Sequence, residues 1–346
     1  MNVNPAPTNI EELLDPTWLS AALSTPDTQV KVASVALAER IKTVASKLRI
    51  KVAYDGDAKL PTSLCIKVNI DQTKASSKIN SVNETRFYRD LGSSVGLRIP
   101  NCYYAGINGE TGEGVLILED LIDSGCRFRT ARIPYTVDEV AGTLAELAQM
   151  HAAYWDDKEV LQQPWLRARI RGLIDIVGDE QLGQQLNDGR FDRLDPQYRD
   201  PHRLKCALGA LDARRTQGPV TLTHGDTHAG NLYVTASGGH GFLDWQIVQR
   251  NCWALDVAYH IAGVLSTDDR TVAERELLDH YLDCLGRNGV TAPNDTDAWS
   301  TYRANLVYGH YLWAITRFVD RDITEEMCSR LGAAVQFHRS YELLEA

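Results

Sequence analysis

Short runs of alternating apolar and polar residues, separated by turn-like sequences, occupy the first third of the chain and predict β-strands. Four such runs are rich in β-branched and apolar residues, and they read RIKVAYD, SLCIKVN, RIPNCYYAGIN and GVLILEDL. Between the second and the third, SVNETRFYRDLG is typical of a helix with an N-cap at Ser81 and a stop at Gly92. The order strand, strand, helix, strand, strand predicts a small antiparallel sheet with one helix on it.

After Leu121 the apolar residues recur with the spacing of a helix face. The first such stretch is VDEVAGTLAELAQMHAAYW. Further helices are expected near residues 253–265, 272–288, 297–320 and 325–342. This part of the chain is therefore predicted to be mainly helical.

Two short helices are expected ahead of the first strand, because Thr8 with Glu11 matches a capping box and Asp15 followed by Pro16 marks a second helix start. Together these patterns predict an α+β protein of two lobes. The small antiparallel-sheet lobe takes residues 1–121, including a helical extension at residues 1–25, and the larger lobe takes residues 122–346. A length of 346 residues fits two units of about 150 residues each.

Composition and charge narrow the possible partners. A formal charge of −10, without a stripe of Lys and Arg, argues against a nucleic-acid partner. Seven cysteines with no C-x-x-C pair argue against a disulfide framework and against a cysteine zinc site. No signal-peptide pattern and no apolar run of about 20 residues is found, so we expect a cytoplasmic protein without a membrane partner. The sequence does not indicate an oligomeric state.

The segment richest in reactive side chains is residues 220–246, VTLTHGDTHAGNLYVTASGGHGFLDWQ, which hold two Asp, three His and one Asn. Strand-like runs around the glycine-rich turn TASGGHG predict a hairpin. A hairpin brings the start of one strand beside the end of the other, so Asn231 and Asp244 are expected to meet, with Asp226 in the loop entering that end. Carboxylate and amide oxygens at one place suit Mg²⁺.

The spacing of these residues matches that of enzymes that transfer phosphoryl groups. His-x-Asp followed five residues later by Asn is the kinase catalytic-loop pattern, here His224, Asp226 and Asn231, and Asp244 after the hairpin is the second metal ligand. Two other interpretations remain open. His224, Asp226 and His228 alternate along the chain and could bind the Zn or Fe of a metal-dependent hydrolase, or the hairpin could be purely structural.

Three segments, HGDTHAGN, FLDWQ and WALD, resemble the aminoglycoside phosphotransferase and choline kinase superfamily. The LDWQ ending is most similar to the ecdysteroid-kinase-like branch and its bacterial relatives. The resemblance implies a two-lobed protein-kinase-like fold and phosphoryl transfer that depends on ATP and Mg²⁺. It implies that Asp226 orients and deprotonates an acceptor hydroxyl, that Asn231 and Asp244 hold Mg²⁺ on the ATP phosphates, and that His224 and Asp256 brace the catalytic loop.

A kinase also needs a strand lysine on the phosphates and a helix glutamate that holds this lysine. Lys67 lies in the centre of an apolar strand, where an unpaired lysine would be costly, and Glu84 in the following helix is the expected partner. Lys67 could instead snorkel from an edge strand, and Glu84 could close a capping box with Ser81. The segment GVLILEDL is expected to join the lobes, with backbone groups up to Glu119 and Leu121 facing the adenine of ATP.

One element expected of a kinase is absent from the sequence. Kinases cover their phosphates with a glycine-rich loop between the first two strands, whereas residues 38–54 contain no glycine. Backbone amides of about residues 42–46 could still approach phosphate, but side chains would crowd them. The sequence therefore leaves open a catalytically impaired, nucleotide-binding pseudokinase.

The acceptor is expected to be a small molecule. Only eleven residues separate Asp244 from Asp256, with no activation segment and no Ala-Pro-Glu motif on which a protein could dock. The predicted helical lobe holds aromatic residues that are expected mostly in its core: Tyr154, Trp155, Trp165, Trp253, Tyr302, Tyr308, Tyr311 and Trp313. Those that line a pocket could contact an apolar ring or a cation, so aminoglycoside, amino alcohol and steroid-like acceptors all remain possible.

Overall fold

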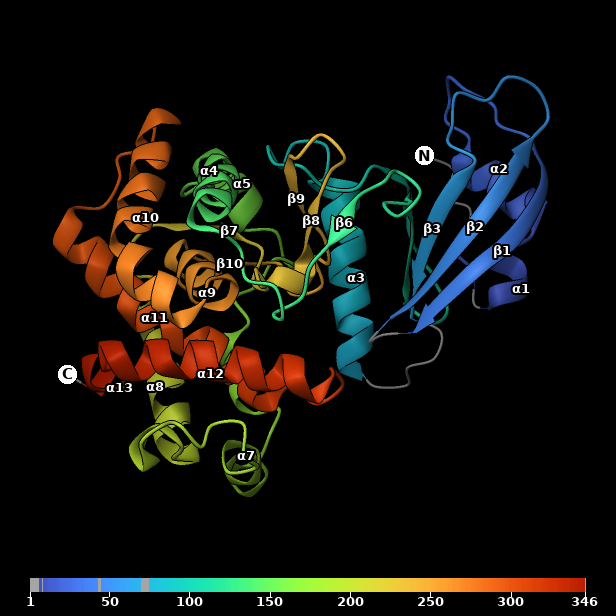
Figure 1. Ribbon diagram of the computed structural model, residues 1–346. Coiled ribbons are helices and arrows are strands. Elements are labelled where there is room, and N and C mark those ends of the chain that lie inside the picture. The colour runs from blue at the N-terminus through green and yellow to red at the C-terminus, as the bar shows by residue number, and fades with distance from the viewer. Residues whose placement is uncertain (1–5, 8, 43–44, 70–74, 346) are drawn as a thin grey trace.

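The N-terminal lobe is built on a five-stranded antiparallel sheet of order β1-β2-β3-β5-β4. The computed structural model describes residues 6–7, 9–42, 45–69 and 75–345. The strands are β1 (Val32–Lys42), β2 (Ser46–Tyr54), β3 (Ser63–Val68), β4 (Cys102–Ile107) and β5 (Gly114–Glu119). Helix α3 (Ala75–Asp90) packs on β4 and β5 and lies between the sheet and the helical lobe (Figure 1). The predicted α+β fold is confirmed.

Two details of this sheet differ from the prediction. Strand β1 was not among the four predicted strands, because most of its eleven residues are exposed and it lacks the apolar alternation of a half-buried strand. Helix α3 begins at Ala75, so the predicted N-cap at Ser81 is wrong: the Ser81 hydroxyl donates to the carbonyl of Lys78 within the helix (3.0 Å). Glu84 therefore lies inside α3 and closes no capping box.

The two faces of the sheet have different roles. Leu64, Ile66 and Val68 of β3 are buried in a cluster with residues of α1 (Ile10–Leu13) and α2 (Pro16–Leu23). Because strand residues alternate, Lys67 lies on the opposite face, toward the helical lobe. The N-terminal helices thus cover the outer face of the sheet and leave the inner face for the site.

The starts of these two helices were predicted in part. The start at Asp15 is confirmed, since its carboxylate accepts a hydrogen bond from the N–H of Thr17 (2.6 Å). The first helix is capped by Asn9, whose side chain accepts from the N–H of Glu12 (2.9 Å). The predicted cap, Thr8, lies outside the described residues.

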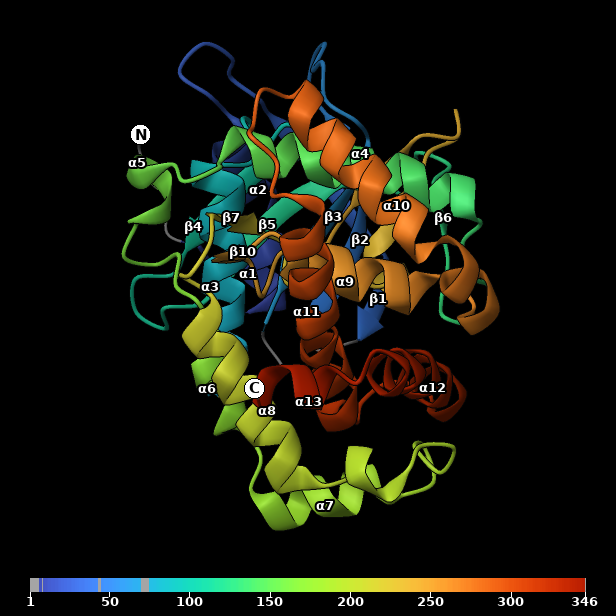
Figure 2. The same cartoon turned by 90° about the vertical axis from the view of Figure 1, so that its left-hand side faces the viewer.

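Helix α9 (Ala254–Val264) forms the centre of the helical lobe, and every one of its residues is buried. It contacts α4 (Val137–Ala153), α10 (Thr267–Arg287), α11 (Asp295–Ile315) and α12 (Arg321–His338), which surround it in Figure 2. The predicted helices of this lobe are all present. Shorter helices complete it: α5 (Lys158–Leu161), α6 (Ile170–Ile174), α7 (Asp179–Leu186), α8 (Pro201–Arg214) and α13 (Ser340–Glu345). None of the helices in the described ranges has the length and apolar character needed to cross a bilayer.

The hairpin within residues 220–246 is shorter than predicted. It consists of β8 (Leu232–Val234) and β9 (His240–Phe242), with β6 (Arg127–Phe128) added on the far side of β8. Strand β7 (Val220–Thr223) pairs outside the hairpin with β10 (Gln249–Cys252). Because β10 reads QRNC and has no apolar alternation, its sequence did not indicate a strand.

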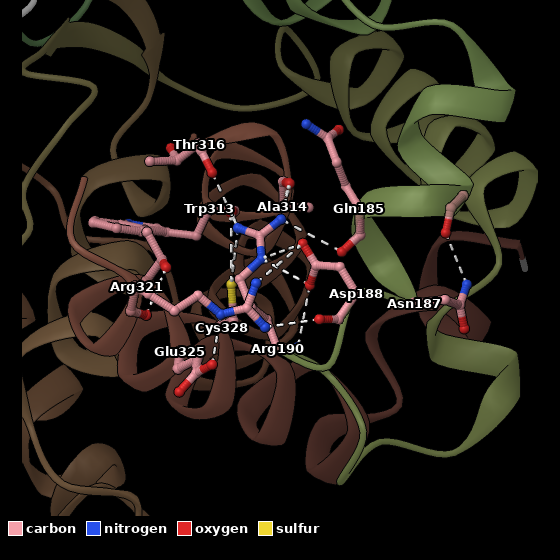
Figure 3. A network of polar contacts seen from close by, with 12 residues as sticks. Gln185, Asn187, Asp188, Arg190, Trp313, Ala314, Thr316, Arg321, Glu325 and Cys328 are labelled. Atoms are coloured by element: carbon pink, nitrogen blue, oxygen red, sulfur yellow. Dashed lines mark hydrogen bonds and ion pairs between the residues drawn. The ribbon is translucent and has the colours of Figure 1, made fainter. Parts of the chain in front are cut away.

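A buried arginine closes the end of α11. The Arg190 guanidinium points at main-chain oxygens of the last turn and the C-cap of this helix (Figure 3), and it donates to the carbonyls of Trp313, Ala314 and Thr316, each at 3.0 Å. The carbonyls at a helix C-terminus lack partners within the helix and attract cations. Arg190 also pairs with Asp188 at 3.0 Å.

Replacing Arg190 by Met should lower the free energy of unfolding by about 3 kcal/mol, because it leaves buried carbonyl groups without donors. Urea titration of the variant measures this loss. Arg321→Met is the matched control, since Arg321 also contacts Asp188 but its side chain is 53% exposed. The control should change stability by less than about 0.5 kcal/mol. Equal midpoints for the two variants would contradict the role assigned to Arg190.

Candidate active site

A carboxylate from α9 holds the backbone of the loop that follows β7. Asp256 is fully buried and accepts hydrogen bonds from the N–H groups of His224 (2.7 Å) and Gly225 (2.8 Å). Gly225 has a φ of +83°, and a Cβ on it would lie 2.5 Å from the carbonyl oxygen of Ile247. The turn before Asp226 therefore requires glycine.

The imidazole of His224 links this loop to the strand end that carries Asp244. Its Nδ1 accepts from the N–H of Asp226 (3.1 Å), so its Nε2 carries the proton and donates to the carbonyl of Leu243 (3.1 Å). Burial lowers the pKa of His224, which favours this neutral form. The described ranges contain no cluster of three His, Cys, Asp or Glu suited to a metal. With both ring nitrogens engaged, His224 gives no support to the hydrolase interpretation.

The Asp226 carboxylate is held at both of its oxygens. The Asn231 amide donates to Oδ2 (3.0 Å), and the Tyr259 hydroxyl donates to Oδ1 (3.0 Å). Tyr259 in turn accepts from the indole N–H of Trp313 (2.6 Å), so helices α9 and α11 together orient the carboxylate. The Asp226 side chain is still 28% exposed. It is thus both fixed in direction and accessible to a substrate hydroxyl.

The two predicted metal ligands lie side by side at the open end of the hairpin. The N–H of Leu243 donates to the carbonyl of Asn231 (3.0 Å), which brings Asp244 next to Asn231. The Asn231 amide nitrogen is used by Asp226, and its Oδ1 accepts no hydrogen bond from the residues that the structure describes. Asp244 has a φ of +67°, a conformation uncommon outside glycine that often marks functional residues. An amide oxygen and a carboxylate thus remain available to a hard cation such as Mg²⁺.

A buried ion pair connects the two lobes beside these ligands. The Lys67 Nζ lies 2.8 Å from the Glu84 carboxylate and 3.1 Å from Oδ1 of Asp244. The N–H of Trp245 donates to Glu84 as well (3.1 Å). Strand β3 is internal to the sheet and Lys67 is only 7% exposed, so snorkelling from an edge strand is excluded.

The charges of this cluster are mutually dependent. Burial opposes ionisation of Asp244, but the charge of Lys67 outweighs it and lowers the Asp244 pKa. Burial would likewise lower the Lys67 pKa, but the charges of Asp244 and Glu84 raise it. Burial and Asp244 raise the Glu84 pKa against the opposing effect of Lys67. The cluster therefore keeps Lys67 as an ammonium and Asp244 as a carboxylate.

The chain also matches a known family. Residues 83–292, more than half of the chain, match the model of the phosphotransferase enzyme family. The chain belongs to this family. The predicted membership of the aminoglycoside phosphotransferase and choline kinase superfamily is thereby confirmed, while the narrower resemblance to ecdysteroid-kinase-like proteins stays a prediction. Among curated proteins, no sequence matches this chain significantly.

Several solved structures share the fold of this chain at low sequence identity. An ethanolamine kinase from Plasmodium vivax is 13% identical over 89% of this chain and 83% of its own, with a TM-score of 0.53. A choline kinase from Cryptosporidium parvum Iowa II is 12% identical over 96% of this chain and 94% of its own, with a TM-score of 0.53. The GDP complex of an aminoglycoside 2′-phosphotransferase-IIIa mutant is 11% identical over 95% of this chain and 97% of its own, with a TM-score of 0.50.

A cavity of about 240 Å³ is lined by the residues predicted to bind a nucleotide. Lys67, Glu84, Asp244, Glu119 and Leu121 all line it. The carboxylate of Glu119 is engaged by the Asn101 amide (3.0 Å) and the Ser124 hydroxyl (2.7 Å), and its backbone N–H donates to the carbonyl of Asn101 (2.8 Å). Apolar side chains also line the cavity: Ile41, Leu121, Ile122, Phe128 and Leu243.

Several residues of the site were missed by sequence reasoning. Phe128 lies in the two-residue strand β6, too short to show a pattern, and it is 45% exposed at the cavity. Tyr259 had a usable signal, because it follows Asp256 by three residues and so faces the same loop from the same helix. Of the aromatic residues singled out, Trp313 reaches the loop through Tyr259, and Tyr308 donates to the carbonyl of Gly225 (2.8 Å).

Gly225→Ala should destabilise the protein strongly, because the new Cβ meets the Ile247 carbonyl and the φ is positive. The expected loss is at least about 3 kcal/mol, measured by urea unfolding. Gly238→Ala is the matched control: its φ is +89°, but its Cβ would meet nothing within 4 Å. The control should lose only about 1–2 kcal/mol. If both variants lost the same amount, the close approach of Ile247 would not be what requires Gly225.

Proposed function

We propose that this protein is a small-molecule kinase that transfers the γ-phosphoryl group of ATP, with Mg²⁺, to an acceptor hydroxyl. The observation that carries the proposal is the contact of Lys67 with both Glu84 (2.8 Å) and Asp244 (3.1 Å). Phosphoryl transfer is catalysed mainly by positioning and by charge. A lysine braced by a helix carboxylate, next to a metal-binding carboxylate, supplies both.

Asp226 fits the role of general base. Its Oδ1 and Oδ2 each accept one hydrogen bond, which fixes the carboxylate but leaves lone pairs for an incoming hydroxyl. As the acceptor oxygen forms its bond to the γ-phosphorus, the hydroxyl proton passes to Asp226 and the bond from phosphorus to the β-phosphate oxygen breaks, which releases ADP. Proximity and orientation account for most of the rate gain in such a transfer.

Asn231 and Asp244 are the residues that would hold Mg²⁺. The fit rests on the Asn231 Oδ1, which accepts no hydrogen bond from the described residues, and on the lowered pKa of Asp244, which keeps this carboxylate ionised. A bound Mg²⁺ supplies charge neutralisation of the phosphate oxygens. Lys67 remains the protein's own cation on the phosphates.

The donor is proposed to bind in the cavity beside Lys67. Phe128 and Ile122 are 45% and 46% exposed, and they offer apolar surface on which a purine ring can pack. The backbone of residues 119–121 is proposed to face the edge of the ring. The acceptor class stays open among aminoglycosides, amino alcohols and steroid-like alcohols, because the aromatic residues near Asp226 are compatible with each.

A nucleotide-binding pseudokinase is the second candidate, favoured by the absence of glycine from residues 38–54. The two candidates differ in turnover, not in nucleotide binding. The experiments below therefore separate binding from transfer.

ATP with Mg²⁺ should raise the melting temperature above the value with Mg²⁺ alone. Ligand at about 100 times its dissociation constant adds roughly 2.7 kcal/mol to stability. Asp244→Ala should lose this shift, because it removes a metal ligand, whereas Asp192→Ala, whose side chain is 68% exposed, should keep it. An unchanged shift in Asp244→Ala would count against the metal role, and no shift in the wild-type protein would remove ATP as the donor.

Asp226→Asn should lower turnover at least about 100-fold, because general-base catalysis contributes 10²–10⁴-fold. ADP release is measured across a panel of aminoglycosides, amino alcohols and sterols, first with the wild-type protein. The variant should keep its ATP-dependent thermal shift, and Asp192→Asn should keep both properties. Wild-type turnover by Asp226→Asn would refute the assignment. ATP binding without turnover on any acceptor in the panel would favour the pseudokinase.

A further inference from the structure

The described residues beside the turn between β1 and β2 are poorly suited to bind phosphate through their backbone. Lys42 pairs with Ser46 across this turn, and Ala45 and Ser46 are only 5% and 3% exposed. Glycine loops bind phosphate because the absence of side chains lets backbone N–H groups approach closely. Here the described part of the turn carries buried side chains instead. Another group must supply the missing interactions if a nucleotide binds in this cavity.

The register of the sheet places a second lysine at the right position. Lys47 of β2 lies directly opposite Lys67 of β3, so the two side chains are on the same face of the sheet. Their neighbours Leu48 and Ile66 are buried on the outer face under the N-terminal helices. Lys47 lines the same cavity as Lys67 and Asp244.

Three basic residues, Lys47, Arg49 and Lys51, lie on this face of β2. The charges of Arg49 and Lys51 are paired with carboxylates. Arg49 binds Asp120 (3.0 Å) and Glu39 (2.7 Å), and Lys51 binds Asp123 (2.5 Å). The Lys47 side chain forms no hydrogen bond or ion pair with any residue in the described ranges.

The charge balance of the cavity calls for a further cation. Lys67 is shared between Glu84 and Asp244, so much of its positive charge is already balanced before a nucleotide binds. A triphosphate adds several more negative charges, and burying them without partners is unfavourable. Lys47 has a flexible stem and three donors, which suit it to bind phosphate as a point charge.

We infer that Lys47 binds the phosphate chain of the nucleotide directly and performs, with its side-chain charge, the task that backbone amides of a glycine-rich loop perform in kinases. The inference rests on the proposed function and specifies how its donor is held. It makes nucleotide binding possible without glycine in residues 38–54.

The test compares Lys47→Gln with Lys51→Gln, a control on the same strand and face that does not line the cavity. Calorimetric titrations measure the affinities for Mg²⁺-ATP and for adenosine. Lys47→Gln should weaken Mg²⁺-ATP at least about tenfold, because a charged hydrogen bond is lost, and should leave adenosine within about twofold. Lys47→Arg should recover most of the affinity. Lys51→Gln should bind both ligands like the wild-type protein.

The outcomes separate this inference from the proposed function. If the wild-type protein binds Mg²⁺-ATP and Lys47→Gln binds it equally well, the inference is wrong and the proposed function stands. If Lys47→Gln weakens adenosine as much as Mg²⁺-ATP, the residue does not act on phosphate and the inference is again wrong. If the wild-type protein binds no nucleotide, both fail together. Melting curves without ligand check that Lys47→Gln is folded, as expected for a residue with no partner among the described side chains.

Discussion

The buried ammonium group of Lys67 determines how the parts of this structure meet. It receives one carboxylate from helix α3 and another from the end of the hairpin, at 2.8 Å and 3.1 Å. An ion pair at this depth is costly to desolvate and is stable only when its geometry is satisfied. The sheet, α3 and the hairpin must therefore adopt their relative positions together. Next to the ion pair, the rings of Phe87 and Trp245 stack with their centroids 3.9 Å apart. This contact packs α3 against the segment that follows β9.

The carboxylate of Asp226, the proposed general base, is oriented mainly from the helical lobe. Asp256 and Tyr259 lie one turn apart on α9, so the first binds the loop backbone and the second binds Asp226. The C-terminal end of α11 adds Trp313, and Arg190 closes that end. His224 is the bridge between this assembly and the Lys67 cluster, because its imidazole joins Asp226 to Leu243. The Lys67 cluster and the Asp226 carboxylate thus have separate supports that meet at one histidine.

The sequence was informative wherever the relevant contacts are local. Asn231 and Asp244 were expected to meet because a hairpin brings the start of one strand beside the end of the other. The helices of the second lobe were predicted from the helical spacing of their apolar residues. Prediction failed where pairing is decided by distant residues. Strand β7 pairs with the polar strand β10, β1 is too exposed to show alternation, and the contact of Tyr259 with Trp313 depends on the packing of α9 against α11. Neither propensity nor spacing carries that information.

The outer face of the sheet explains why a side chain, rather than a loop, can carry the phosphate contact. A glycine-rich loop must close over its ligand, which requires strands that can bend at that point. Here Leu48, Ile50 and Val52 of β2 are buried beneath α1 and α2, so bending the strand would expose apolar surface. A lysine with several rotatable bonds can adjust to the phosphates without any movement of the backbone. The N-terminal helices pack on the outer face of the sheet, while the basic residues of β2 lie on its inner face, where the proposed phosphate contact of Lys47 needs no movement of the backbone.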